Sequence, residues 1–140
     1  AGIGPAASVI ETRLKNHAVC VGFMQPQEIG AIYASADFMV IPSHVETWSM
    51  VAAEALACSL PVIAAAQSGV GRFIGDSVAG ELVHKNTADA FAAVIEKAFK
   101  THNKTQRSAQ ALQLAAAHFP TREEALAQDL IPIWQRVRKA

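Results

Sequence analysis

Two glutamates, Glu46 and Glu54, are the side chains of this sequence whose types and spacing most clearly suggest chemistry. The apolar residues 38–41 predict a strand, Glu46 follows it in a polar turn, and Glu54 lies in a helix expected to begin near Trp48. At about 100° per residue, Glu54 comes roughly two turns into that helix. Both carboxylates can then face the crevice above the carboxyl edge of a parallel sheet, where open α/β sheets bind ligands.

The groups around these glutamates suit a nucleotide. Ser43, the backbone amides of Trp48 to Met50 and the positive end of the following helix favour phosphate or another anion. A carboxylate such as that of Glu54 accepts two hydrogen bonds, which a ribose diol can donate. The alternative interpretation is structural: Glu46 is a solvated loop residue and Glu54 pairs with a nearby cation.

The elements that position these residues alternate between short apolar strands and amphipathic helices, which predicts an α/β fold with a Rossmann-like parallel sheet flanked by helices. We expect strands at residues 18–21, 38–41, 62–65 and 81–83. Helices are expected at residues 6–15, 27–35, 48–57, 89–100, 104–117 and 121–138. The glycine-rich residues 68–80 predict a loop with at most one helical turn at 72–74, and Thr87 is the expected cap of the helix after it. The chain is thus expected to end in several helices.

Length and composition bound the class of protein. The 140 residues predict a single domain with a real core; 51% are hydrophobic, 17% are charged and the formal net charge is zero. This composition argues against a disordered chain and against a nucleic-acid-binding protein, which would show a basic face. No apolar run approaches the roughly 20 residues that cross a bilayer, so a cytoplasmic protein with small-molecule or protein partners is expected.

The cysteines and histidines do not predict a metal site. Cys20 and Cys58 stand in apolar contexts, where we expect small hydrophobic side chains rather than a disulfide or a reactive thiol. The histidines show no ligand-like spacing: His17, His44, His84, His102 and His118. No metal and no cofactor are expected.

The beginning of the chain predicts a fragment of a longer protein. Residues 1–5 are typical of the exit from a strand, and the first residue is alanine rather than methionine. A naturally short protein is the alternative. Gly2-x-Gly4 is a weak phosphate-loop pattern, for which a tight turn is the simpler interpretation.

A set of short motifs, in order and spacing, carries a family resemblance. The set comprises Gly2-Ile3-Gly4-Pro5, Val21-Gly22-Phe23, Tyr33-Ala34-Ser35-Ala36-Asp37, Val40-Ile41-Pro42-Ser43, Glu46-x7-Glu54, Glu54-Ala55-Leu56-Ala57-Cys58, Pro61-Val62-Ile63-Ala64, Gly69 and Gly80-Glu81-Leu82-Val83. From residue 2 to residue 137 the chain resembles the C-terminal, donor-binding domain of retaining GT-B glycosyltransferases, of the type called glycosyl transferases group 1 or family four.

The resemblance implies a function for each matching position. It implies a sugar transfer from a nucleoside diphosphate sugar to a glycan or lipid-linked saccharide, as in polysaccharide or lipopolysaccharide biosynthesis, with retention of configuration. Glu46 is the implied catalytic residue, which approaches the donor sugar and stabilises developing charge. Glu54 is implied to hold the ribose hydroxyls. The implied substrate-binding residues are Gly4, Phe23, Ser43, Thr47, Trp48, Ser49, Met50 and Glu54, with the nucleotide base near residues 22–24.

The departures from the family pattern concern four residues at three sites. Ser59 stands where the family usually has glycine, and at a positive φ it would carry strain of about 1 kcal/mol or more. Gly71-Arg72 replaces the common Pro-Glu and reverses a charge beside the donor pocket, so that Arg72 either contacts phosphate or is a solvated loop residue. Trp48 replaces the usual phenylalanine and keeps an aromatic wall.

The resemblance also implies partners outside this chain. The arginine and lysine that grip the diphosphate are expected on segments before residue 1, as is the N-terminal acceptor lobe, so the 140 residues should be inactive alone. Because lipid-linked acceptors are common in the resembling family, peripheral association with the inner membrane face is a further expectation. The alternative function is a non-catalytic, GT-B-like interaction or nucleotide-binding module, with an apolar patch formed by Ile131, Ile133, Trp134 and Val137. A nucleotide-sugar epimerase shares the architecture but lacks this glutamate spacing.

Overall fold

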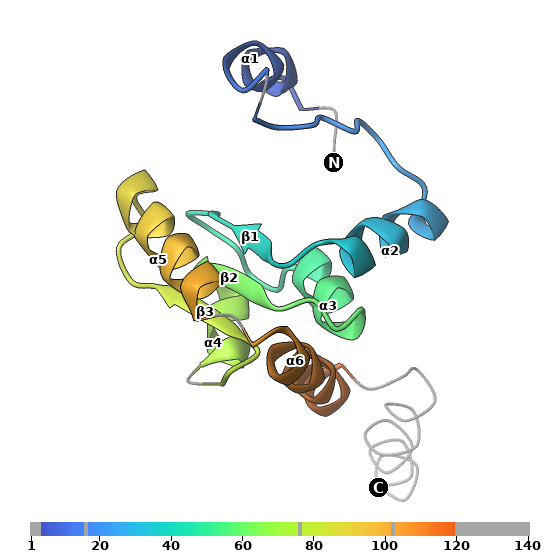
Figure 1. Ribbon diagram of the computed structural model, residues 1–140, viewed down its shortest axis with the longest axis vertical. Helices are drawn as coiled ribbons and strands as arrows, with labels where there is room; N and C mark the ends of the chain where they lie inside the picture. Colours follow the sequence, from blue (N-terminus) through green and yellow to red (C-terminus); the bar gives the residue numbers. More distant parts are fainter. Residues whose placement is uncertain (1–3, 16, 76, 102, 120–140) are drawn as a thin grey trace, which may run out of the picture. The chain divides into compact units, whose positions relative to one another are not determined.

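The computed structural model of the protein describes residues 4–15, 17–75, 77–101 and 103–119 (Figure 1). The chain divides into two compact units, Ala1–Ser35 and Ala36–Ala140. The single-domain expectation stays a prediction. The expected helix at 121–138 lies outside the described residues, and so do Gly2 and the apolar patch of Ile131, Ile133, Trp134 and Val137.

The first unit contains two helices and an extended segment. Helix α1 spans Ala7–Arg13 and helix α2 spans Pro26–Ser35, close to the predicted bounds. The strand predicted at residues 18–21 is wrong, because these residues are extended but belong to no sheet. A strand needs a neighbour for its N–H and C=O groups, and strand pairing among the described residues joins only β1 with β2 and β2 with β3. Val19 is accordingly 88% exposed.

The second unit is built on a parallel sheet. Its strands are β1 at Met39–Ile41, β2 at Val62–Ala65 and β3 at Gly80–Val83, in the order β1-β2-β3. Met39 is in register with Val62, and Val62 with Gly80. These strands confirm the three predicted at 38–41, 62–65 and 81–83. Because all run in one direction, the loops that follow them meet at one edge of the sheet.

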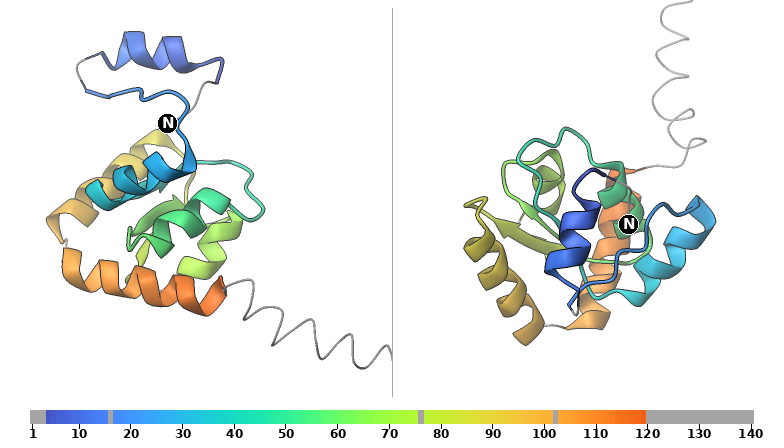
Figure 2. Two further views of the ribbon diagram at one scale, coloured as in Figure 1. Left: turned by 90° about the vertical axis from the view of Figure 1, so that its right-hand side faces the viewer. Right: turned by 90° about the horizontal axis from the view of Figure 1, so that it is seen from above.

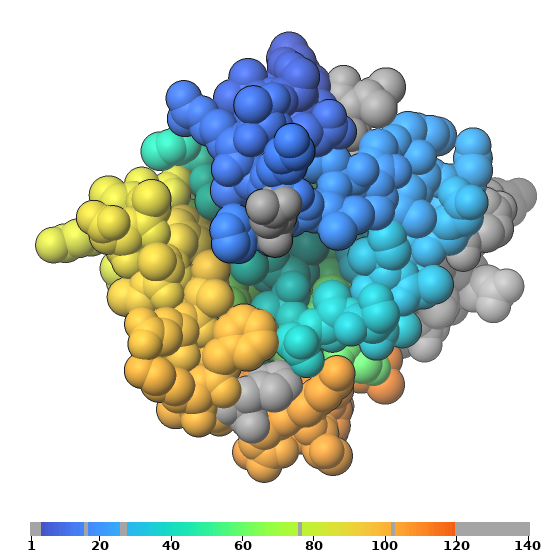
Figure 3. Space-filling model, turned by 45° about the horizontal axis from the view of Figure 1, so that its top comes forward, coloured from blue at the N-terminus to red at the C-terminus, as the bar shows by residue number. Residues whose placement is uncertain are grey.

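Helices cover both faces of this sheet, as expected for a parallel α/β layer (Figures 1 and 2). Helix α5, Ala88–Lys100, packs on β3 at one face. On the other face, α3 at Met50–Ala57 and α4 at Gly69–Ile74 pack on the strands and on α6, Lys104–His118. The surface of α5 forms one side of the second unit in the space-filling view (Figure 3). The α/β fold class is confirmed.

The core lies on the central strand, whose four residues are all buried. Ile63 and Ala65 pack with Phe91 and Ala98 of α5, while the alternate residues of β2 point to the opposite face. Thr87 caps α5 as predicted, since its side-chain oxygen accepts a hydrogen bond from the Ala90 amide at 3.4 Å. Helix α5 thus has the apolar stripe and the cap that its sequence predicts.

The end of α3 confirms the expected strain at Ser59. The Leu60 amide donates to the Ala55 carbonyl at 2.9 Å and the Ser59 amide to the Leu56 carbonyl at 2.9 Å, which is the Schellman arrangement at a helix C-terminus. This arrangement requires a left-handed residue, and Ser59 has φ 62°. A non-glycine residue there costs about 1–2 kcal/mol relative to an unstrained backbone.

An ion-pair network fastens α6 to the sheet. The buried Arg107 donates to Glu81 of β3 at 2.7 Å, and its guanidinium lies 5.8 Å from the centre of the Phe38 ring. Lys97 of α5 pairs with the same carboxylate at 3.5 Å. Burial acts to raise the pKa of Glu81, but the Arg107 hydrogen bond and the charges of Lys97 and Arg107 outweigh it and lower that pKa below its ordinary value.

The cysteines differ from the expectation in one respect. Cys20 and Cys58 are free thiols, and both are exposed rather than packed as small hydrophobic side chains. Cys58 comes after the last residue of α3, where the chain turns at the surface. Among the described helices, none combines the length with the apolar composition needed to cross a bilayer.

Candidate functional site

The loop that carries Glu46 runs from the end of β1 to α3, over residues 42–49, and hydrogen bonds from two other loops hold it. The Asn86 side chain, after β3, donates to the Ser43 carbonyl at 3.2 Å. The Gly69 amide, at the start of α4, donates to the Glu46 carbonyl at 2.7 Å. The loops after all three strands therefore meet at the carboxyl edge of the sheet, where a ligand site was expected.

Gly69 permits this close approach of two backbone segments. A Cβ atom built on Gly69 would collide with the carbonyl oxygen of Thr47 and would lie 3.1 Å from the Glu46 carbonyl oxygen. The position is therefore limited to glycine by the neighbouring loop rather than by its own φ, which is not positive. The Glu46 loop can therefore take this path only because residue 69, at the start of α4, has no side chain.

Helix α4 corrects the prediction of a loop over residues 68–80. Ser68 is buried at its N-terminus, where its hydroxyl accepts from the Gly71 amide at 3.2 Å and donates to the Ala65 carbonyl at 2.6 Å. The cap joins the end of β2 to the helix and satisfies a terminal amide. Gly71 is needed because a Cβ there would lie 2.6 Å from the Ala66 carbonyl oxygen. The glycines that suggested a loop thus serve close packing within a short helix.

An aromatic cluster contacts the loop at Trp48. The Trp48 ring meets Phe73 of α4 edge-on, with 5.0 Å between the ring centroids, and Phe119 after α6 at 5.8 Å. Phe73 also contacts Phe119 at 5.5 Å and His118 at 5.3 Å. Edge-to-face pairs contribute about 0.5–1.5 kcal/mol beyond the area they bury. Trp48 nevertheless remains 48% exposed, so part of its ring is available to a ligand.

These contacts surround a pocket of about 390 Å³ within the second unit. It is lined by Glu46, Thr47, Trp48, Gln67, Gly69, Arg72 and Phe73. Three of these residues belong to the predicted site, and Arg72 was predicted to be either a phosphate contact or a solvated residue. Sequence reasoning did not identify Gln67 and Phe73. Their only signal was their position after β2, beside a loop whose conformation was unknown.

The two glutamates of the pair occupy different positions. Glu46 is half-buried in the pocket lining, and its Oε1 accepts a hydrogen bond from the Ser49 amide at 3.0 Å. Glu54 is an exposed residue of α3 and does not line this pocket. The carboxylate of Glu46 thus orders the start of α3, whereas Glu54 lies on the surface of that helix.

The start of α3 differs from the expected one. The helix begins at Met50 rather than near Trp48, because Ser49 adopts φ 49° and ψ 80°, outside the helical region. Ser49 is only 4% exposed, and its hydroxyl finds no hydrogen-bond partner among the described residues. Of the three amides expected to meet phosphate, that of Ser49 is therefore already bonded to Glu46, while Met50 is exposed at the first helical position.

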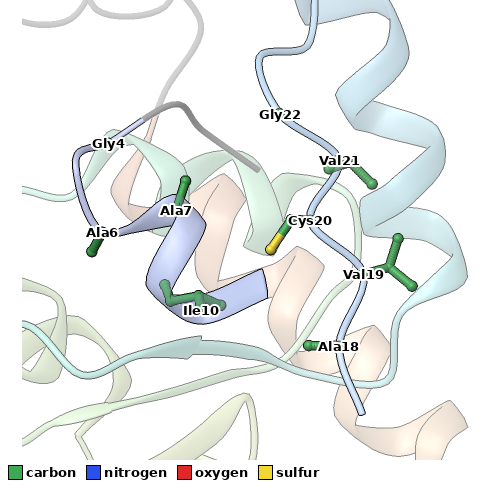
Figure 4. Close-up of a pocket in the computed structure, with 9 residues that line it drawn as sticks. All are labelled: Gly4, Ala6, Ala7, Ile10, Ala18, Val19, Cys20, Val21 and Gly22. Atoms are coloured by element: carbon green, nitrogen blue, oxygen red, sulfur yellow. The ribbon is translucent and has the colours of Figure 1, made fainter. Parts of the chain in front are cut away.

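Two predicted site residues, Gly4 and Phe23, lie in the first unit. Gly4 lines a separate pocket of about 320 Å³ between α1 and the extended segment, together with Ile10, Cys20 and Gly22 (Figure 4). Cys20 points from the extended segment toward α1 in this view. Phe23 is exposed and does not line the pocket. The residues expected near a nucleotide base, 22–24, thus adjoin a cavity of their own unit.

The described residues contain no group of three or more His, Cys, Asp and Glu side chains placed to hold a metal ion. The second-unit pocket nevertheless has varied chemistry: one carboxylate, one guanidinium, one amide and two aromatic rings. Hydrogen-bonding groups beside aromatic faces match the alternating hydroxyls and apolar C–H faces of a sugar ring.

Comparisons with known proteins identify relatives of the chain. The family described as glycosyl transferases group 1 matches residues 6–113. The D-inositol 3-phosphate glycosyltransferase of Mycolicibacterium gilvum is 40% identical over 82 residues, which cover 56% of this chain and 19% of that protein. The protein of the same name from Salinispora tropica is 32% identical over 127 residues, 83% of this chain and 26% of its own length.

Solved structures share the fold. Sucrose-phosphate synthase from Thermosynechococcus elongatus matches 94% of this chain with a TM-score of 0.78 and 25% identity, over 33% of its own chain. Anabaena Alr3699/HepE, crystallised in complex with UDP, matches 94% with a TM-score of 0.69 and 24% identity, over 34% of its own chain. The chain therefore spans about a fifth to a third of the length of these proteins.

Proposed function

Because the chain belongs to the glycosyl transferases group 1 family, we propose that it is the donor-binding part of an enzyme that transfers a sugar from a nucleoside diphosphate sugar with retention of configuration. One observation carries the proposal: Glu46, the first member of the glutamate pair, lines a pocket at the carboxyl edge of the parallel sheet. Ligands of open α/β sheets bind at this edge. The proposed acceptor is a glycan or a lipid-linked saccharide.

Each member of the pair has a proposed role that fits its position. Glu46 approaches the donor sugar, because one carboxylate oxygen is held by the Ser49 amide while the side chain lines the pocket. Fixed charges of this kind stabilise a transition state without reorganisation. Glu54 binds the ribose hydroxyls from its exposed place on α3. Ser43, Thr47 and the amides of Trp48 and Met50 contact the diphosphate or the sugar hydroxyls.

A solved structure with the same fold suggests which nucleotide to test first. Anabaena Alr3699/HepE was crystallised with UDP and, in a second structure, with UDP and glucose. We propose a uridine nucleotide as donor, with Phe23 near the base and Gly4 as a further substrate-binding residue. The proposed enzyme works without a metal ion, at the cytoplasmic side of the membrane, and it requires an acceptor lobe and further diphosphate-binding cations beyond these 140 residues.

The test is ligand-observed NMR of the chain with UDP, GDP, ADP and CDP, comparing the wild type with Glu54→Ala and Glu46→Ala. We expect UDP to bind the wild type and Glu46→Ala to change that binding little. Glu54→Ala should weaken the binding at least about tenfold, because hydrogen bonds to a charged group contribute about 1.5–3 kcal/mol. Glu96→Ala is the matched control, because Glu96 is an exposed helical glutamate whose ion pair with Lys100 lies at the surface.

In an enzyme that contains this domain and its acceptor lobe, Glu46→Ala should lower kcat much more than it raises KM, because its contact strengthens in the transition state. Equal and small effects of Glu46→Ala and Glu54→Ala on binding and turnover would overturn the role assignment. Binding of all four nucleotides with the same affinity in the wild type and in Glu54→Ala would overturn the donor site itself.

A further inference from the structure

Arg72 is a cation of the second-unit pocket whose charge the described residues leave without an ion pair. The described ion pairs use the cations Lys97, Lys100, Lys104 and Arg107. Arg72 is exposed on α4 and lines the pocket. An arginine at a pocket wall is always charged at physiological pH and presents a planar set of N–H donors.

Glu46 does not neutralise this charge, although both side chains line the same pocket. No ion pair between these two described residues is present, and Glu46 Oε1 instead accepts from the Ser49 amide. The pocket thus keeps a positive and a negative group apart. A ligand with hydroxyls near Glu46 and an anionic group near Arg72 matches both groups, whereas an uncharged sugar matches only the first.

Two further lining residues of this pocket are aromatic. Trp48 and Phe73 line the pocket edge-to-face, 5.0 Å apart, and Trp48 is half exposed. Aromatic faces bind the apolar C–H face of a pyranose, and Gln67 adds an amide that can both donate and accept hydrogen bonds. The volume of about 390 Å³ accommodates a single sugar ring with one charged substituent.

We propose that this pocket binds a sugar ring that carries a carboxylate or phosphate group, with Trp48 contacting the ring and Arg72 forming a two-pronged pair with the anion. The inference rests on the proposed glycosyltransferase function and adds a specificity-determining residue to it. The anion has three possible sources: an acid group on the transferred sugar, the diphosphate of the donor, or a phosphate on the acceptor. All three present oxygens that fit the guanidinium fork.

The experiment follows the indole N–H signal of Trp48 in ¹⁵N spectra of the full 140-residue chain, assigned with Trp48→Phe. The probes are methyl glucoside, methyl glucuronide, glucose 6-phosphate and UDP, titrated to millimolar concentrations. Methyl glucuronide differs from methyl glucoside by a carboxylate in place of the hydroxymethyl group, and glucose 6-phosphate is a glucose ring that carries a phosphate on that hydroxymethyl group. The variants are Arg72→Gln, Arg72→Lys and the control Lys85→Gln, which removes an exposed positive charge that does not line the pocket.

We expect at least one anionic probe to bind the wild type about tenfold more tightly than methyl glucoside, as a charge-assisted pair implies. Arg72→Gln should abolish this preference, Arg72→Lys should retain part of it, and Lys85→Gln should keep it. A preference for the glucuronide would identify the anion as the acid group of a sugar. A preference for glucose 6-phosphate would identify it as a phosphate on a sugar. A response to UDP alone that depends on Arg72 would identify it as the diphosphate of the donor.

Absence of any anion preference in the wild type, or a preference that survives Arg72→Gln, would overturn the inference. Failure of this inference about Arg72 is distinguishable from failure of the proposed function. UDP binding that depends on Glu54 but not on Arg72 would leave the donor site standing and remove only the role of Arg72. Sugar-anion binding that depends on Arg72, together with binding of all four nucleotides at the same affinity in the wild type and in Glu54→Ala, would instead remove the proposed donor site and leave the role of Arg72.

Discussion

Replacement of Gly69 by alanine should destabilise the second unit and displace the loop that carries Glu46. The new Cβ would collide with the Thr47 carbonyl oxygen, so the loop or the start of α4 must move. Overpacking of this kind costs about 1–3 kcal/mol, and loss of the 2.7 Å bond from the Gly69 amide to the Glu46 carbonyl adds about 1 kcal/mol. The expected loss in free energy of unfolding is therefore about 2–4 kcal/mol.

Urea denaturation followed by circular dichroism measures this loss, and amide spectra report the loop. In thermal unfolding, a loss of 1 kcal/mol lowers Tm by roughly 3 °C for a chain of this size, so the same destabilisation should lower Tm by about 6–12 °C. The matched control is Gly30→Ala in α2, where a Cβ meets nothing within 4 Å and alanine favours the helix by up to about 1 kcal/mol. A Gly69→Ala variant that is as stable as the wild type, with unchanged amide shifts at Glu46 and Trp48, would refute the steric argument.

Two further predictions concern stability. Ser59→Gly should raise the free energy of unfolding by about 1 kcal/mol, because it relieves a left-handed serine at the end of α3; an unchanged or lower denaturation midpoint would contradict this. The pKa of Glu81 is lower in the folded protein than the ordinary glutamate pKa of 4.5. Its ion pair with Arg107 should therefore stabilise the fold fully at pH values above 4.5. This stabilisation should be lost as the pH falls through the lowered pKa of the folded state. The difference in free energy of unfolding between the wild type and Glu81→Gln should therefore be largest near neutral pH and should shrink below about pH 4. If this difference does not change with pH, the ion pair between Glu81 and Arg107 is not its source.

Several elements were predictable because their signals are local. Helix α5 has an apolar stripe, a threonine cap and basic residues in its last turn, all within Thr87 to Lys100. The central strand is a short apolar run bounded by Pro61 and by a polar segment, which favours a strand buried on both faces. The left-handed serine at residue 59 was likewise expected, because a family position usually occupied by glycine indicates a special backbone conformation.

The errors arose where the decisive contact is distant in sequence. Residues 18–21 have the composition of a strand, but a strand also needs a neighbour, and no described strand pairs with them. The glycines of α4 suggest a loop until it is known that the Glu46 loop packs against Gly69. The exposure of Cys58 follows from its place after the end of α3 rather than from its apolar neighbours.

The sequence by itself determined the α/β alternation, the order of the strands along the chain, and the placement of Glu46 directly after one of them. Periodicity, caps and chain order are properties of neighbouring residues, so they can be read without coordinates. Only the tertiary structure decided that Trp48, Phe73 and Arg72 share a pocket with Glu46 while Glu54 lies outside it. That grouping depends on how the loops after β1 and β2 pack on each other, which in turn depends on backbone contacts between residues more than twenty positions apart.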